Sequence, residues 1–239
     1  MKKIKIFVYN SSHKKHSHTQ LVIDKLLGYI SSSIEIEICS HSALCDDISQ
    51  CIGCEKCFYE GKCPLDDLDS MKLIKKDLIE ADIIILGTPV YSAMVSGNMK
   101  IFMDRLSYYL HLLTLRGKII IPIISSSSNS LIETNEYLVR IAESWGGSVP
   151  FSILFTVDAP NMIESKSFTD IKIKEYAHCL LDYCVGKQYL KASDYQEIYY
   201  NQLKKSYFIP NLSAEYLYWK NNGLLNYKNY QEILDEMKN

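Results

Sequence analysis

The sequence predicts an α/β fold in which helices cover a doubly wound parallel sheet of five strands. Two near-continuous apolar runs, ADIIILGTPVY at 81–91 and KIIIPIISSSS at 118–128, are typical of central parallel strands buried on both faces. Each run is followed by a polar loop and then by apolar residues at helical spacing. Strands that alternate with helices in this way indicate βαβ units with right-handed crossovers.

The remaining elements follow from similar patterns. The β-branched and aromatic run KIKIFVY indicates a first strand, and the strict alternation of IEIEIC indicates a strand near the edge of the sheet. The expected strands are 3–9, 34–39, 81–91, 118–128 and 148–157. The expected helices are 20–30, 67–79, 97–110 and 131–147, the last of them closed by Gly146 and Gly147.

After about residue 160 the pattern changes to helical segments rich in tyrosine. We expect one domain over residues 1–160, followed by a helical C-terminal extension over 161–239 that packs on the core or at a subunit interface. The tyrosines could line a ligand site, but half-buried packing residues are the favoured interpretation.

Composition narrows the function classes. With 239 residues, 47% of them hydrophobic, and a net charge of −2, the chain has no electrostatic footprint for nucleic acid or for an anionic membrane surface. No apolar run approaches the length of a membrane-spanning helix. Eight cysteines without a secretion signal indicate a reducing compartment, so we expect a cytoplasmic protein.

Polar loops follow three of the predicted strands, where ligands bind in open α/β sheets. The first loop, 10–19, has Ser and Thr hydroxyls just before a helix N-terminus, an arrangement that suits a phosphate; a solvated loop with an N-cap is the alternative. The second is TPVYSAMVSGN at 88–98, and the third is SSSSN at 125–129. Because GxGxxG is absent, we expect a flat mononucleotide cofactor here.

Half of the cysteines lie in one segment, CIGCEKCFYEGKC at 51–63. The spacing of Cys51, Cys54 and Cys57 lets three thiolates converge on one centre, and Cys63 can supply the fourth ligand of a 4Fe-4S cluster. Structural zinc and bare thiols, which act as a redox switch or form a disulfide, remain alternatives. The other cysteines, Cys39, Cys45, Cys179 and Cys184, lack comparable spacing and are interpreted as ordinary core or surface residues.

The stretch CPLDDLDSMKLIKKDLIEADIIILGTPVYSAMVSGNMKIFMDRL at 63–106 resembles the core signature of the flavodoxin-like NADPH-dependent FMN reductase family. The resemblance covers about residues 3–155, and the compact cysteine motif is similar to that of the family's iron-sulfur flavoproteins. It implies a flavodoxin-like fold, FMN as cofactor and assembly as a homodimer or homotetramer. The first loop departs from the family's usual glycine-containing pattern.

Carried over by position, the resemblance implies two groups of FMN-binding residues. The phosphate would be bound by Ser11, Ser17, His18 and Thr19. The isoalloxazine ring would face Pro89, Val90, Tyr91 and Ser92, while Ser125 and Ser126 would contact its other edge or the ribityl chain. Lys100, Asp104 and Arg105 match the family's helix, either as ion pairs that orient it or as ligand contacts.

The resemblance, together with the cysteine spacing, implies an electron-transfer oxidoreductase that passes electrons between NAD(P)H or ferredoxin, FMN and a 4Fe-4S cluster. One alternative is an NAD(P)H-dependent reductase of quinones, azo compounds or a biosynthetic intermediate, without a cluster. A second is a redox- or metal-sensing module. No residue presents itself as a catalytic acid or base, because the chemistry would belong mainly to the cofactors.

Overall fold

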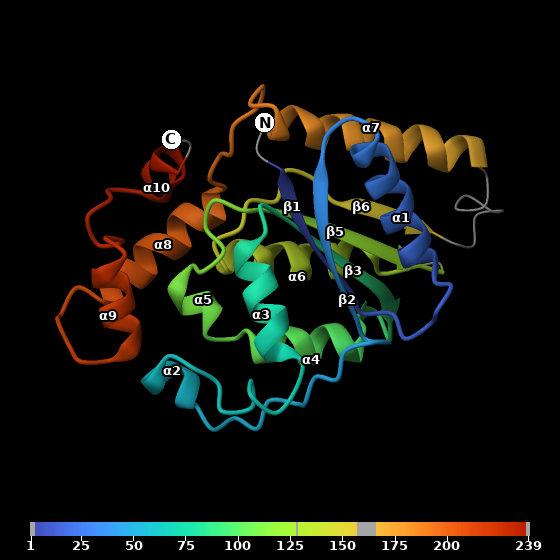
Figure 1. Cartoon of the computed structure of the whole chain (residues 1–239). Helices are drawn as coiled ribbons and strands as arrows, with labels where there is room; N and C mark the ends of the chain where they lie inside the picture. Colours follow the sequence, from blue (N-terminus) through green and yellow to red (C-terminus); the bar gives the residue numbers. More distant parts are fainter. Residues whose placement is uncertain (1–2, 128, 157–165, 238–239) are drawn as a thin grey trace.

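The structure is a computed structural model that describes residues 3–127, 129–156 and 166–237. Its core is one sheet in which five strands run parallel in the order β2-β1-β3-β5-β6 (Figure 1). The order reverses between β1 and β3, as in flavodoxin-like folds. The predicted doubly wound sheet is therefore confirmed, with β2 at one edge as expected. The strands are β1 (Ile4–Asn10), β2 (Ile36–Ser42), β3 (Ile83–Tyr91), β5 (Ile119–Ser126) and β6 (Ile153–Thr156), and a short β4 (Met94–Val95) pairs antiparallel with β3.

Helices cover both faces of the sheet because alternate side chains of each strand point to opposite faces. In β1, Ile6 and Val8 pack in a cluster with α1 and α7, whereas Phe7 and Tyr9 pack in a second cluster on the opposite face. The first face is covered by α1 (His18–Ser31) and α7 (Lys166–Cys184), and the second by α3 (Met71–Glu80), α4 (Gly97–Arg105), α5 (Tyr109–Leu112) and α6 (Leu131–Ser144).

The C-terminal helices extend the second cluster (Figure 1). Their buried aromatic residues include Tyr200, Trp219 and Tyr230, and the hydroxyl of Tyr230 donates to the carbonyl of Gly146 at 2.5 Å. The interpretation of these tyrosines as packing residues is thereby supported. These helices are α8 (Asp194–Ser206), α9 (Ala214–Asn221) and α10 (Tyr230–Glu236). The expected domain boundary near residue 160 lies outside the described residues, and the division into two domains stays a prediction.

Two predicted elements differ in the structure. The helix expected over 97–110 is divided into α4, which ends at Arg105, and α5, which begins at Tyr109, because Leu106 after α4 has φ −107° and ψ 11°, outside the helical range. The last strand begins only at Ile153, after Pro150, which lacks the N–H needed for a ladder hydrogen bond; Val157, at its expected end, lies outside the described residues. Within the described segments, no helix has the length and apolar character needed to cross a bilayer.

Candidate functional site

The three polar loops meet in one cavity of about 260 Å³ at the carboxyl ends of β1, β3 and β5. This position is the crevice expected at the point where strand order reverses. The lining residues are Ser12, Lys14, Ser17, His18, Pro89, Val90, Tyr91, Ser125, Ser126 and Ser127. The convergence that the sequence predicted therefore occurs, except that Ser128 of the third loop lies outside the described residues.

Hydrogen bonds hold the first loop in place. Ser17 caps α1, since its hydroxyl accepts from the N–H of Gln20 at 3.1 Å, and Asn10 accepts from the N–H of Ser12 at 3.0 Å while donating to the Gln20 side chain at 2.7 Å. The first turn of a helix leaves N–H groups without intrahelical partners, and these favour an anion. Lys14 adds positive charge and the lining residues include no carboxylate, so this end of the cavity suits a phosphate.

Three of the ten predicted FMN-binding residues do not line the cavity. The buried Ser11 donates to the carbonyl of Gly87 at 3.0 Å and accepts from the hydroxyl of Ser96 at 2.8 Å, so that it ties β1 to β3 and to the start of α4. The buried Thr19 hydroxyl lies 2.8 Å from that of Ser125. These two residues position the loops from behind, and their contact with FMN stays a prediction.

Ser92, the third of these residues, belongs to the turn between β3 and β4. Ser92 and Ala93 have φ values of 49° and 63°, a conformation that glycine or asparagine usually adopts in two-residue hairpins. The turn leaves Tyr91 exposed at the wall of the cavity, where its ring is available to a flat ligand.

Three residues that line the cavity were not among the predicted FMN-binding residues: Ser12, Lys14 and Ser127. The place of Ser12 and Lys14 in the strand-to-helix loop was the available signal.

The four cysteines of residues 51–63, the cysteine segment, are free thiols. Cys51 and Cys54 are exposed, and Cys57 and Cys63 are half-buried. Burial raises the pKa of the Cys57 thiol, and the charges of Cys63 and Cys51 raise it further, which places three of the four thiols within electrostatic reach of one another. Among the described residues, however, no three Cys, His, Asp or Glu side chains are arranged closely enough to hold a metal ion. As a donor set the segment suits an iron-sulfur cluster, but its arrangement is more open than a bound cluster requires.

A buried ion-pair network anchors the residues that follow the cysteine segment. The side chain of Arg105, at the end of α4, is fully buried; it pairs with both carboxylate oxygens of Asp69, with Asp66 at 2.9 Å, and donates to the carbonyl of Ser49 at 2.9 Å. Lys75 also binds Asp66, at 2.8 Å. Of the two alternatives for Arg105, the structure therefore favours the ion pair that orients the helix.

The same network fixes the charge of Asp69. Burial alone would favour its protonated form, but the Arg105 guanidinium and the N–H groups of Met71 and Ser49 hold the pKa of Asp69 below its usual value. On the surface of α4, Lys100 pairs with Asp104 at 2.5 Å, a contact between exposed side chains.

The C-terminal extension supports the other side of the cysteine segment. A short helix, α2 (Lys56–Glu60), contains Cys57 and ends at Gly61, whose added Cβ would lie 3.6 Å from the Cβ of Ala214 at the start of α9. Phe58 packs against the ring of His111 with centroids 5.0 Å apart. The segment is thus anchored by α9, which contacts α2, and by Arg105 of α4, which binds the flanking residues Ser49, Asp66 and Asp69.

A parallel sheet of this strand order, with a basic, hydroxyl-lined cavity at its switch point, defines a flavodoxin-like nucleotide-binding protein. The chain belongs to the NADPH-dependent FMN reductase family, whose profile matches residues 4–160. This confirms the resemblance seen in the sequence.

Curated relatives agree with this assignment. An iron-sulfur flavoprotein of Methanocaldococcus jannaschii is 41% identical over 105 residues, which are 43% of this chain and 51% of the relative. An iron-sulfur flavoprotein of Archaeoglobus fulgidus is 32% identical over 138 residues, 56% of this chain and 60% of the relative. The chain thus spans 51% to 60% of the length of these two relatives.

The solved structures share the fold. RosB with its bound intermediate superposes with a TM-score of 0.57 at 18% identity, covering 73% of this chain and 76% of RosB. The apo form of an NADH:FMN oxidoreductase superposes with a TM-score of 0.55 at 18% identity, covering 80% of this chain and 92% of that chain.

Proposed function

We propose that the chain is an FMN-dependent oxidoreductase in which a 4Fe-4S cluster, bound by Cys51, Cys54, Cys57 and Cys63, exchanges electrons with the flavin. The family assignment supports FMN, and the names of the curated relatives support the cluster. When bound, FMN supplies one- and two-electron chemistry, so that it can connect a hydride donor to a one-electron acceptor.

The protein's own contribution is to bind and orient. Lys14, Ser12, Ser17 and the N-terminus of α1 would hold the phosphate, while Pro89, Val90 and Tyr91 would provide a wall for the ring and Ser125 and Ser126 the opposite side. Ser11 and Thr19 act on this site through the loops they tie together.

The observation that carries the proposal is the position of α4 between the two sites. At its start, Ser96 caps the helix and donates to Ser11 of the flavin loop at 2.8 Å. In its middle, the pKa of Lys100 is raised by its hydrogen bond to Asp104 and, to a smaller extent, by the charge of Cys51. One helix of nine residues, ~13 Å long, therefore links the flavin cavity to the cysteine segment.

Partners follow from the same proposal. NAD(P)H or a ferredoxin would donate or accept electrons, and the assembly would be a homodimer or homotetramer in which the exposed Cys51 and Cys54 lie at the surface of each subunit.

The test is anaerobic purification followed by iron, sulfide, zinc and flavin analysis. We expect FMN together with about four irons and four sulfides per chain. Cys54→Ser should lose the iron and keep FMN, whereas Cys45→Ser, which changes an exposed cysteine outside the segment, should keep both. Zinc without flavin would contradict the proposal.

A second candidate is an NAD(P)H-dependent reductase of quinones, azo compounds or a biosynthetic intermediate, with no cluster. The open arrangement of the four thiols favours it. FMN without iron in the anaerobic preparation would select this candidate over the first.

A further inference from the structure

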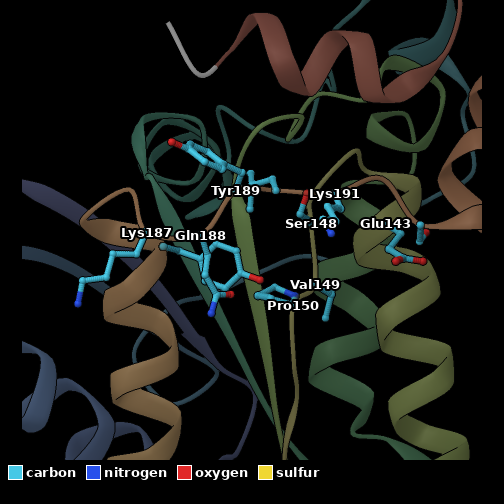
Figure 2. Close-up of a pocket in the computed structure, with 11 residues that line it drawn as sticks. Glu143, Ser148, Val149, Pro150, Lys187, Gln188, Tyr189 and Lys191 are labelled. Carbon is cyan, nitrogen blue, oxygen red and sulfur yellow. The ribbon is translucent and has the colours of Figure 1, made fainter.

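Lys75 of α3 is a buried lysine, which is rare in proteins because an ammonium group loses its water on burial. By contrast, Figure 2 shows Lys187 and Lys191 at a cavity of about 440 Å³ beside the end of α6, and both of these lysines are exposed. The Lys75 side chain is only 7% exposed, so solvent and salt screen its charge much less. This charge can therefore act strongly on a neighbouring site.

The partners of Lys75 belong to the buried ion-pair network. Its ammonium donates to both carboxylate oxygens of Asp66, at 2.9 and 2.8 Å, and lies 5.1 Å from the ring centroid of the buried Tyr108. Asp66 also binds Arg105, whose guanidinium pairs with Asp69. Without Lys75, Asp66 would still have a cationic partner in Arg105. The pairing of Asp66 alone therefore does not explain a second buried cation.

The network is joined to the half-buried end of the cysteine segment. The N–H of Asp66 donates to the carbonyl of Cys63 at 3.2 Å, and Cys57 packs against the apolar cluster that contains Tyr108. Burial raises the pKa of the Cys57 thiol, and the charge of Lys75 opposes that rise. Burial also raises the pKa of Tyr108, and the charges of Cys57 and Cys63 raise it further. The ammonium of Lys75 is thus within electrostatic reach of this end of the segment.

A buried cation at this place has a consequence for electron transfer. Four thiolates make a 4Fe-4S cluster an anion, and reduction by one electron adds a further negative charge. A nearby cation stabilises the reduced form more than the oxidised form. We propose that Lys75 raises the reduction potential of the cluster held by the cysteine segment, and that Asp66 limits this effect by neutralising part of the charge. The inference rests on the function proposed above.

The test is a dithionite titration of the anaerobic, iron-loaded protein with redox mediators, followed by electron paramagnetic resonance of the reduced cluster. Lys75→Met, which removes the charge and keeps the length of the side chain, should lower the midpoint potential. We expect a change of about tenfold in the equilibrium constant, which is about 59 mV for a one-electron couple. Lys72→Met is the matched control on the same helix: it removes an exposed lysine that pairs with the exposed Asp67 at 2.6 Å, and should leave the potential nearly unchanged.

Asp66→Asn is a second variant and should shift the potential in the opposite direction. It leaves two cations, Lys75 and Arg105, beside the single carboxylate of Asp69, so the local charge becomes more positive. A general loosening of the network would instead move the potentials of Lys75→Met and Asp66→Asn in the same direction. Lys75→Arg keeps the charge and should keep the potential close to that of the unmodified protein.

Iron, sulfide and flavin analysis of each protein separates this inference from the function on which it rests. FMN without iron in the unmodified protein overturns the proposed function and the role of Lys75 with it. In the iron-loaded proteins, an unchanged potential in Lys75→Met, or shifts of the same sign in Lys75→Met and Asp66→Asn, overturns the role of Lys75 alone. Loss of iron from both variants would assign the network to cluster retention, and would also overturn this inference.

Discussion

Glu215 of α9 accepts a hydrogen bond from Nδ1 of His111 at 2.7 Å, and its second carboxylate oxygen accepts from the hydroxyl of Tyr207 at 2.8 Å. The ring of His111 in turn packs against Phe58, the residue after Cys57. One carboxylate of the C-terminal extension thus orients the side chain against which the cysteine segment rests.

Glu215→Ala is expected to loosen the cysteine segment, because His111 loses the partner that orients its ring. Amide hydrogen exchange of residues 51–63 should become several-fold faster, with little change in the strands of the core. Glu215→Gln, which keeps an acceptor oxygen at the same place, is the control and should exchange nearly as slowly as the unmodified protein. Equal exchange in all three proteins would show that Glu215 does not position the segment.

The same carboxylate should contribute stability that depends on pH. Burial favours its protonated form, but hydrogen bonds from His111 and Tyr207 hold the pKa of Glu215 below its usual value. A group with a lowered folded-state pKa contributes stability above its unfolded pKa of about 4.3 and loses it as the pH falls through the folded value. In urea unfolding, the stability difference between the unmodified protein and Glu215→Gln should therefore shrink between about pH 5 and about pH 3. A difference that stays constant over this range would contradict the assignment.

Arg105→Lys should destabilise the protein although it keeps the charge. The single ammonium group of a lysine cannot donate to Asp66 and Asp69 in the way that the planar guanidinium of Arg105 does. Breaking a buried ion pair lowers the free energy of unfolding by about 3 kcal/mol. Lys100→Ala on the same helix removes only an exposed pair with Asp104 and should change the free energy of unfolding by less than about 0.5 kcal/mol. Chemical denaturation of both variants measures the difference, and equal effects would argue against a structural role for the buried network.

Gly87→Ala tests how closely α1 must approach β3. A Cβ at Gly87 would lie 2.8 Å from Ile23 Cδ1 and 2.9 Å from Thr19 Cγ2, so these side chains or the helix that carries them must shift. We expect a loss of about 1 to 3 kcal/mol in unfolding free energy and weaker FMN binding. Gly28→Ala within α1 has open space around the added Cβ and should be neutral or stabilising. Thermal unfolding and FMN titration would refute this packing argument if the two variants behaved alike.

Lys14→Ala should weaken FMN binding several-fold at low salt, and less at high salt, since Lys14 is the charged residue that lines the cavity. Lys15→Ala removes an equal charge one position away, outside this lining, and should have a smaller effect. Quenching of FMN fluorescence during titration measures both affinities. A larger loss for Lys15→Ala would place the phosphate elsewhere.

The fold could be predicted because its strands carry strong signals: buried runs such as 81–91 are apolar throughout, and the loops that follow them are polar. The details that escaped prediction depend on tertiary contacts. The β3–β4 hairpin uses Ser92 and Ala93 at positive φ, where no Asn-Gly or Gly-Gly pair marks a turn. Likewise, the sequence cannot distinguish a serine that faces the cavity, such as Ser12, from its neighbour Ser11, whose hydroxyl turns inward to Gly87.

α4 is a single rigid helix between the two sites. The position of one site relative to the other therefore changes when a residue is inserted in the helix, whereas a flexible linker would absorb the insertion. One residue inserted between Ser96 and Arg105 would turn the following residues by about 100° around the helix axis and carry Arg105 away from Asp66 and Asp69. Homologous chains that keep both sites should therefore carry no insertions within this helix.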